Sequence, residues 1–298
     1  MAQRAYKERT MTGLILNRFA RHRLAVLGLL LLGLLSASAL ALPLYPYDPE
    51  DINLREKFDP PSLTHPMGTD DLGRDVLARI LAGGRVSLTV GLLATGLALI
   101  IGTLIGAFAG FYGGWLDNLL MRLTDTFLSF PSLFVLIMLG AIIRDTALSE
   151  ATGGVPTIIM VIALLSWMTL ARLVRATFLS LREQEFVTAA RSVGVVNRRL
   201  MFMHLLPNAL GPILVQAALL TAYAIITESG LSYLGFGIQP PTPSWGNMLN
   251  SAQIHMIQYP WLAVFPGLMI FVTVMAINFV GDGLRDAFDP HSLRGGGH

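Results

Sequence analysis

The chain has 298 residues, of which 53% are hydrophobic and only 13% are charged, whereas an ordinary soluble domain has about 25% charged residues. This composition excludes a typical soluble enzyme and indicates a membrane protein. The formal net charge is +2, without a basic face with interleaved aromatic residues, which argues against nucleic acid as a partner. The absence of cysteine excludes disulfides, thiolate metal sites and cysteine nucleophiles.

Six windows of the sequence lack Asp, Glu, Lys and Arg and are long enough to cross a bilayer as helices of roughly 20 residues. They cover residues 24–44, 86–110, 126–143, 155–171, 207–227 and 261–281. We therefore predict an all-α integral membrane protein with six transmembrane helices. The predicted organisation is a cytoplasmic N-terminal segment (1–23), a first transmembrane helix (24–44), an external loop (45–85), a core of five helices (86–281) with an inside loop at 172–206, and a cytoplasmic tail (282–298).

The first window has an alternative interpretation as a secretory signal. An arginine-rich start, a leucine run and the string Ala37-Ser38-Ala39 resemble such a signal and its cleavage site. The apolar run is longer than the ~7–15 residues of a signal core, and no soluble domain follows it. A transmembrane helix is therefore the favoured interpretation.

The distribution of basic residues predicts the orientation. With the N-terminus inside, 15 of the 21 Lys and Arg side chains fall in inside segments and 6 in outside segments. Because Lys and Arg near span ends favour the cytoplasm, both termini are expected to be cytoplasmic. With the acidic residues included, the charge separates into about +7 inside and −5 outside.

Two patterns inside the windows concern helix geometry. Gly102, Gly106 and Gly110 recur at every fourth position, which lets two helix backbones approach closely in lipid. Pro131 lies early in the third window, where it either kinks and opens the helix or occupies its first turn. The sequence leaves these two interpretations open.

Candidate catalytic and ion-conducting groups are few. Asp125, Glu228 and Asp282 lie at window edges, where we expect them to reach water, and the windows themselves contain no ionisable residue that could relay protons. Sodium sites made of backbone carbonyls remain compatible with this pattern. The external string Thr69-Asp70-Asp71 precedes the apolar-periodic residues 72–81, so we interpret it as a helix start rather than a catalytic carboxylate group.

The sequence also has no recognisable means of using ATP or a metal. The only lysines, Lys7 and Lys57, do not follow a glycine, which excludes a P-loop. The six histidines include no close pair at ligand spacing, and no GxSxG string occurs, so neither a catalytic group nor a metal site is predicted. The energy for any transport must therefore enter through a partner.

The inside loop at 172–206 has a defined pattern. Residues 185–193 favour a short helix, which Gly194 would end, and residues 198–206 form a second amphipathic stretch before Pro207, which suits the first turn of the fifth span. Ala189 and Ala190 would offer a surface that another protein could approach closely. The alternative is an elbow that packs only on its own chain.

Residues 185–194 (Glu-Phe-Val-Thr-Ala-Ala-Arg-Ser-Val-Gly), followed after nine residues by His204-Leu-Leu-Pro207, resemble the coupling motif of binding-protein-dependent ABC importer permeases. Thr188 and His204 depart from that motif, which has Glu and Ile there; Glu185 could supply the acidic contact in place of Thr188. The strings at 65–75, 231–247 and 281–290 resemble the C-type permease subunit of dipeptide, oligopeptide and nickel importers. The resemblance extends over nearly the whole chain.

The resemblance implies a type I ABC importer permease fold (MetI-like), with a five-helix core preceded by one N-terminal helix, in a prokaryotic inner membrane. It implies as partners a homologous second permease, two cytoplasmic ATP-binding subunits, an external substrate-binding protein and a peptide substrate, with ATP and magnesium bound only in partner subunits. Nickel, glutathione or another small solute is the alternative cargo. The coupling contacts that it implies are Glu185, Thr188, Ala189, Ala190, Arg191, Gly194 and Pro207.

Polar residues within the spans are the candidates for lining a translocation pathway: Ser129, Ser132, Ser166, Thr169, Gln216, Thr221, Thr227 and Asn278. Each could instead form a hydrogen bond within its own helix.

The outside loop at 228–260, rich in proline and without Lys or Arg, is expected to be irregular and to receive the binding protein, cap the passage or simply connect two spans. An integral membrane enzyme would need a nucleophile or metal constellation that we do not find, and a structural scaffold would not explain the spacing of the 185–207 motif.

Overall fold

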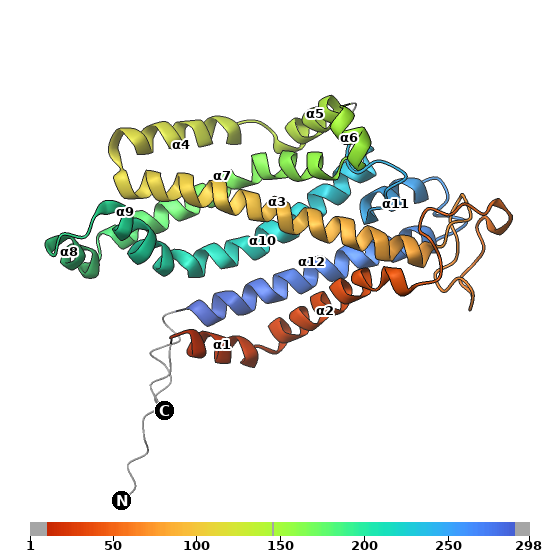
Figure 1. Cartoon of the computed structure of the whole chain (residues 1–298), viewed down its shortest axis with the longest axis horizontal. Helices are drawn as coiled ribbons and strands as arrows, with labels where there is room; N and C mark the ends of the chain where they lie inside the picture. The colour runs from red at the N-terminus through yellow and green to blue at the C-terminus, as the bar shows by residue number, and fades with distance from the viewer. Residues whose placement is uncertain (1–10, 145, 290–298) are drawn as a thin grey trace, which may run out of the picture.

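The computed structural model describes residues 11–144 and 146–289, and these form a bundle of helices without a strand beyond one isolated bridge (Figure 1). The long helices are α2 (Arg23–Leu40), α3 (Val76–Tyr112), α7 (Val155–Arg182), α10 (Leu206–Tyr233) and α12 (Trp261–Phe288). Shorter elements are α1 (Met11–Arg21), η1 (Leu42–Leu44), η2 (Leu54–Glu56), α4 (Gly114–Leu128), α5 (Ser132–Arg144), α6 (Ala147–Thr152), α8 (Glu185–Ser192), α9 (Asn197–Arg199), the π-helical turn η3 (Leu200–Leu205) and α11 (Trp245–Ala252).

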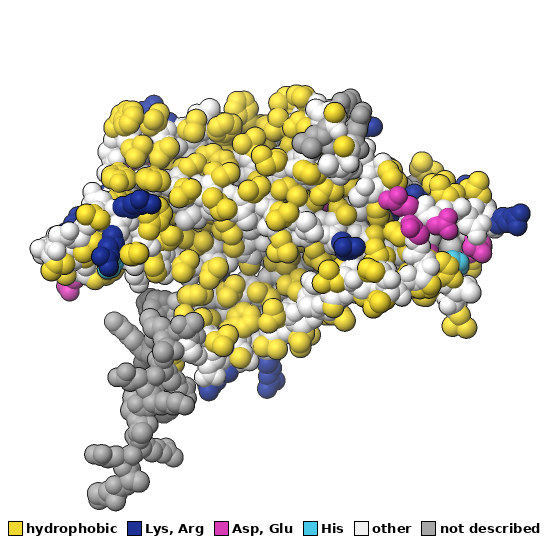
Figure 2. Space-filling model, in the orientation of Figure 1, with side chains coloured by type: hydrophobic (Ala, Val, Ile, Leu, Met, Phe, Trp, Pro, Cys, Tyr) yellow, Lys and Arg dark blue, Asp and Glu magenta, His cyan; other side chains and the backbone are white. Residues whose placement is uncertain are grey.

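The predicted membrane-spanning architecture is confirmed. Five of the described helices are long and apolar enough to cross a membrane, and a sixth span results if the bent pair α4 and α5 counts as one. Apolar side chains cover most of the surface in Figure 2, whereas acidic side chains gather at the end that carries the loop after α2. Exposed leucines and phenylalanines such as Leu30 and Phe134 are therefore on the lipid or partner side of these helices.

The third span is a broken helix. α4 and α5 meet at an angle of 81°, and Pro131 lies in the break, directly before the first residue of α5. Its carbonyl accepts hydrogen bonds from the backbone amides of Phe134 and Val135, so the proline starts the second half of the span. Ser129 and Ser132 lie on either side of this break, and both are exposed.

The glycine row in the second span packs α3 against α7, as predicted. A Cβ atom at Gly102 would lie 2.7 Å from the carbonyl oxygen of Trp167, and one at Gly110 would lie 2.6 Å from that of Arg175. At Gly106 the nearest atom would be the carbonyl oxygen of Ala171, closer still. Backbone atoms therefore occupy the space on this face of α3, and only glycine permits the observed separation.

The start of α3 corrects one expectation. The helix begins at Val76 rather than after Asp71, and its N-terminal cap is Asp75, whose Oδ1 accepts a hydrogen bond of 2.7 Å from the amide of Ala78. Asp70 instead accepts from the Arg74 guanidinium (2.7 Å) and from two backbone amides, closing a turn before the helix. The helix also extends into the segment 76–85 that we assigned to the external loop.

Glu228 corrects a second expectation. It lies at a window edge but does not reach water, since its side chain is fully buried. Its carboxylate accepts hydrogen bonds from the hydroxyls of Ser232 (2.7 Å) and Ser87 (2.9 Å), with Ser229 at 3.5 Å. Hydroxyl donors satisfy the buried oxygens, as burial of a polar group requires.

The outside segment 228–260 is more ordered than expected. α10 continues to Tyr233, and α11 begins with a capping box in which Ser244 and Asn247 exchange side-chain and backbone hydrogen bonds. The indole of Trp245 is buried and donates to the carbonyl of Ile80 in α3 (3.1 Å). The segment is therefore a folded cap held on α3.

Candidate functional site

The predicted coupling segment lies at one tip of the molecule. α8 and α9 lie at the opposite end of the bundle from the loop after α2 (Figure 1). Residues 172–182, which we placed in the loop, complete α7, and residues after Leu200 continue through η3 into α10. What remains is an elbow, residues 183–199, displayed between the ends of two spans.

Gly194 ends α8 in the way the sequence predicts. Its φ is +81°, in the left-handed region, and no atom lies within 4 Å of the position a Cβ would take. The amide of Gly194 donates to the carbonyl of Arg191 (2.9 Å), and that of Val195 donates to the carbonyl of Ala190 (3.1 Å). This pair of bonds is a Schellman motif, which glycine closes without strain.

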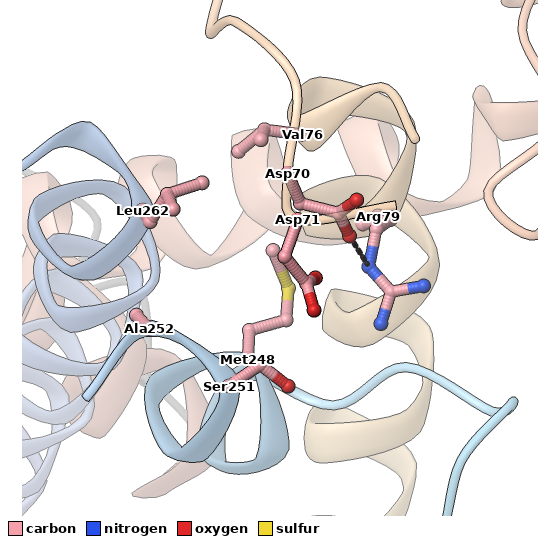
Figure 3. A pocket seen from close by; sticks show the side chains of 8 residues that line it. All are labelled: Asp70, Asp71, Val76, Arg79, Met248, Ser251, Ala252 and Leu262. Atoms are coloured by element: carbon pink, nitrogen blue, oxygen red, sulfur yellow. Dashed lines mark ion pairs between the residues drawn. The ribbon is translucent and has the colours of Figure 1, made fainter. Parts of the chain in front are cut away.

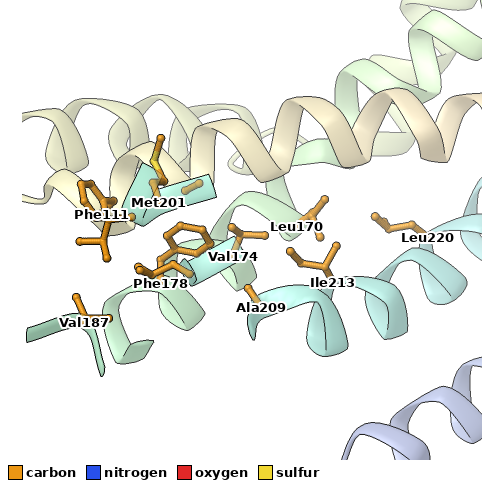
Figure 4. Packing of buried hydrophobic residues seen from close by; sticks show 12 residues of the cluster. Phe111, Leu170, Val174, Phe178, Val187, Met201, Ala209, Ile213 and Leu220 are labelled. Carbon is orange, nitrogen blue, oxygen red and sulfur yellow. The ribbon is translucent and has the colours of Figure 1, made fainter. Parts of the chain in front are cut away.

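One face of the elbow packs onto the bundle. Val187 is fully buried in a cluster with Phe178 of α7 and Met201 of η3, as Figure 4 shows. Ala190 and Val195 pack against the same cluster. Movement of the elbow is therefore expected to move the ends of α7 and α10 with it, because packed side chains resist separation.

The opposite face of the elbow is open. The predicted contact residues on this face are Glu185, Thr188, Ala189, Arg191 and Gly194, all exposed. Of the other two, Ala190 is half-buried against the chain's own core, and Pro207 lies in the first turn of α10. Sequence reasoning missed three apolar neighbours with exposed side chains, Phe186, Val193 and Val196, of which Val193 is 80% exposed. Exposed apolar side chains of this kind are typical of surfaces that contact another protein or a membrane.

Comparison with known proteins identifies the family of the chain. Residues 102–294 match the model of the binding-protein-dependent transport system inner membrane component. The chain belongs to this permease family. Residues 10–61 match a second model, the N-terminal transmembrane domain of oligopeptide transport permease C.

Relatives of this permease cover nearly its whole length. A Brucella suis protein named as a peptide permease is 46% identical over 279 residues, 93% of this chain and 90% of the relative. The oligopeptide transport system permease protein of Bacillus subtilis is 40% identical, covering 92% and 87% of the two chains. The glutathione transport system permease protein of Pectobacterium atrosepticum is also 40% identical, covering 92% and 89%.

The fold is that of a solved importer permease. An inward-facing structure of the MetNI methionine ABC transporter superposes with a TM-score of 0.57 at 18% identity, covering 70% of this chain and 94% of the other. The predicted MetI-like fold is therefore confirmed. α1 and α2 lie within residues 10–61, the part of the chain that matches the second model.

The predicted pathway residues of the permease differ in burial and in hydrogen bonding. Ser166 is buried among helices without a hydrogen-bond partner in the described residues, and Thr221 donates to the carbonyl of Ala217 (2.9 Å). Thr169 is exposed, and Thr227 and Asn278 are half-buried. Gln216 lines a cleft of about 490 Å³ between α7, α10 and α12. Which of these residues line a pathway stays a prediction.

The external string at 65–75 holds the permease's first external loop in place. His65 Nδ1 lies 2.8 Å from the carboxylate of Asp75, the α3 cap. Burial, and then the charge of Asp75, raise the pKa of the Tyr45 phenol to about 12, so this phenol stays neutral beside the carboxylate. The string therefore fixes the loop on α3.

A small cavity lies between this loop, α11 and α12. Figure 3 shows Asp70 and Asp71 together with Arg79 and Met248 around it, and the Arg79 guanidinium lies 3.4 Å from Asp70. Its volume is about 20 Å³, which is room for one water molecule. The cavity is too small for a substrate and belongs to the packing of the external end.

Proposed function

We propose that this chain is the permease subunit of an ATP-driven importer of dipeptides and oligopeptides and forms half of the translocation pathway. The observation that carries the proposal is the elbow, which is anchored by Val187 and presents Thr188, Ala189 and Arg191 outward. The names of relatives from Bacillus subtilis and Brucella suis support peptides as the cargo.

The proposed assembly contains a second, homologous permease, two cytoplasmic ATP-binding subunits and an external substrate-binding protein. ATP and magnesium bind in the ATP-binding subunits, and this chain holds no cofactor and no catalytic residue. Both termini and the elbow lie on the cytoplasmic side. The excess of basic side chains in the segments assigned to that side supports this orientation.

In the proposed mechanism the elbow rests on an ATP-binding subunit. Closure of the two ATP-binding subunits on ATP draws the elbows together and rocks the two permeases as rigid bodies between inward-facing and outward-facing states. The packing of Val187 against Phe178 and Met201 supports the transfer of this movement to α7 and α10. Selectivity resides mainly in the external binding protein, because the six sequence windows carry no charged side chain that would grip a substrate.

Uptake by the reconstituted complex tests the cargo. The full complex in proteoliposomes, with ATP inside and the binding protein outside, is expected to accumulate a radiolabelled dipeptide and tripeptide in an ATP-dependent manner. The matched assays use radiolabelled glutathione and ⁶³Ni²⁺. Glutathione is the alternative cargo to test because the relative named for glutathione transport is as similar to this chain as the Bacillus subtilis oligopeptide permease, 40% identical in both cases. Uptake of glutathione or nickel without uptake of either peptide would contradict the peptide assignment.

A further inference from the structure

α4 is attached to its own chain in an unusual way. Its side chains Trp115, Leu119 and Leu123 are exposed, and the only buried residues of this helix are Asp117 and Thr124. A helix that packs by the hydrophobic effect buries an apolar stripe. In α4 the buried positions are polar, so a different interaction must fix the helix on the bundle.

Two ion pairs supply that interaction. Arg175 of α7 donates from Nε to Asp117 Oδ1 (2.5 Å) and from Nη2 to Oδ2 (2.6 Å), a two-bond fork. Arg172, about one turn earlier in α7, contacts Asp125 Oδ1 at 2.5 Å. The Asp117 side chain is 11% exposed and that of Arg175 34%, so water screens this fork less than a surface pair. Bidentate geometry also fixes orientation, which a single contact does not.

The fork lies between two functional parts of the chain. α7 runs from Arg175 directly to the elbow, whose Val187 packs on Phe178 one turn below. α4 runs from Asp117 in the other direction to the break at Pro131 and the 81° bend into α5. The charged contacts are therefore placed to make α4 follow a displacement of α7.

We propose that the pairs Arg175–Asp117 and Arg172–Asp125 transmit movement of the elbow from α7 to the bent span α4 and α5, which makes these four side chains positioning residues for transport. The inference rests on the proposed function, because it takes the elbow to be the part that the ATP-binding subunits move. Breaking the fork releases α4 from α7, so ATP hydrolysis proceeds while the bent span no longer changes position with it.

A charge exchange tests the proposal in the reconstituted complex. Asp117→Asn and Arg175→Gln are each expected to lower the peptide imported per ATP hydrolysed by about tenfold, because either change removes the fork, and Arg175→Gln also leaves the buried Asp117 carboxylate unpaired. The double variant Asp117→Arg with Arg175→Asp restores the pair with reversed polarity and is expected to recover most of that ratio. The control Asp286→Asn removes a carboxylate that contacts His22 at the same end of the molecule and is expected to leave the ratio unchanged.

A second measurement is independent of transport. Because the chain has no cysteine, spin labels at Leu119→Cys in α4 and Ala176→Cys in α7 report their separation without labelling of any other residue of this chain. Asp117→Asn is expected to broaden this distance distribution, and the charge exchange is expected to narrow it again. If the single variants keep both the wild-type ratio and the wild-type distribution, or if the exchange restores neither, the proposal is wrong. If instead the unmodified complex hydrolyses ATP without importing peptide, the proposed function fails, while the distance measurement still decides whether the ion pairs hold α4.

Discussion

Replacing Gly106 by alanine is expected to lower the thermal stability of the permease, although Gly→Ala in a helix usually raises stability by up to about 1 kcal/mol. The added methyl group would meet the carbonyl oxygen of Ala171 and lie 2.7 Å from the Cβ of Val174. Neither atom can move away from the added methyl group unless the α7 backbone moves, so α3 and α7 must separate. Overpacking of this kind costs about 1–3 kcal/mol.

The matched control for this change is Gly96→Ala in the same helix. Gly96 has no atom within 4 Å of the added methyl group, so its replacement is expected to leave the unfolding midpoint unchanged or raise it. The measurement is thermal unfolding of the purified complex in detergent, followed by tryptophan fluorescence. Equal midpoints for the two variants would show that the close contact of α3 with α7 does not limit stability.

Replacing Gly194 by valine is expected to reduce ATP-driven uptake by about tenfold while membrane insertion stays unchanged. A β-branched residue at φ +81° is strained by about 1–2 kcal/mol, enough to change the population of the loop conformation by about that factor. Because nothing lies within 4 Å of the added side chain, the effect comes from the backbone and not from a clash with the core. The end of α8 then takes another path, and the exposed face of the elbow changes shape.

Gly194→Asn is the control for backbone strain. Asparagine tolerates the left-handed region, so this variant is expected to import peptide at nearly the wild-type rate although it also adds a side chain. Uptake and ATP hydrolysis are measured on the same proteoliposomes. A valine variant with wild-type uptake would exclude the conformation at Gly194 as a requirement for coupling.

The sequence was informative where one local pattern determined one contact. The four-residue glycine spacing predicted the contact face of α3, and the position of Gly194 predicted the end of α8. Both depend on backbone geometry that only glycine allows, so these predictions did not depend on the identity of the neighbouring residues. The six-span count followed from the length of uncharged windows for a similar reason.

Other features depend on residues far apart in the chain. Glu228 looked free to reach water because its neighbours in sequence end a span, but one of its partners is Ser87, 141 residues away. The start of α3 was misplaced because Asp70 and Asp75 both suit a helix cap, and the contact of Asp70 with Arg74 decides between them. The sequence also did not decide which apolar residues of α8 face outward, since Phe186 and Val187 are adjacent and apolar, and only packing separates the exposed one from the buried one.

The central claim, that the elbow contacts an ATP-binding subunit, is tested most directly by site-specific crosslinking. The chain has no native cysteine, so Thr188→Cys carries a photoactivatable thiol reagent at one exposed position on α8. The control is Leu63→Cys, at a fully exposed position in the loop at the opposite end. After illumination of the assembled complex in membranes, Thr188→Cys is expected to form an adduct with the ATP-binding subunit, and Leu63→Cys is expected to form none with it. Absence of that adduct from Thr188→Cys, or its formation from Leu63→Cys, would contradict the placement of the elbow.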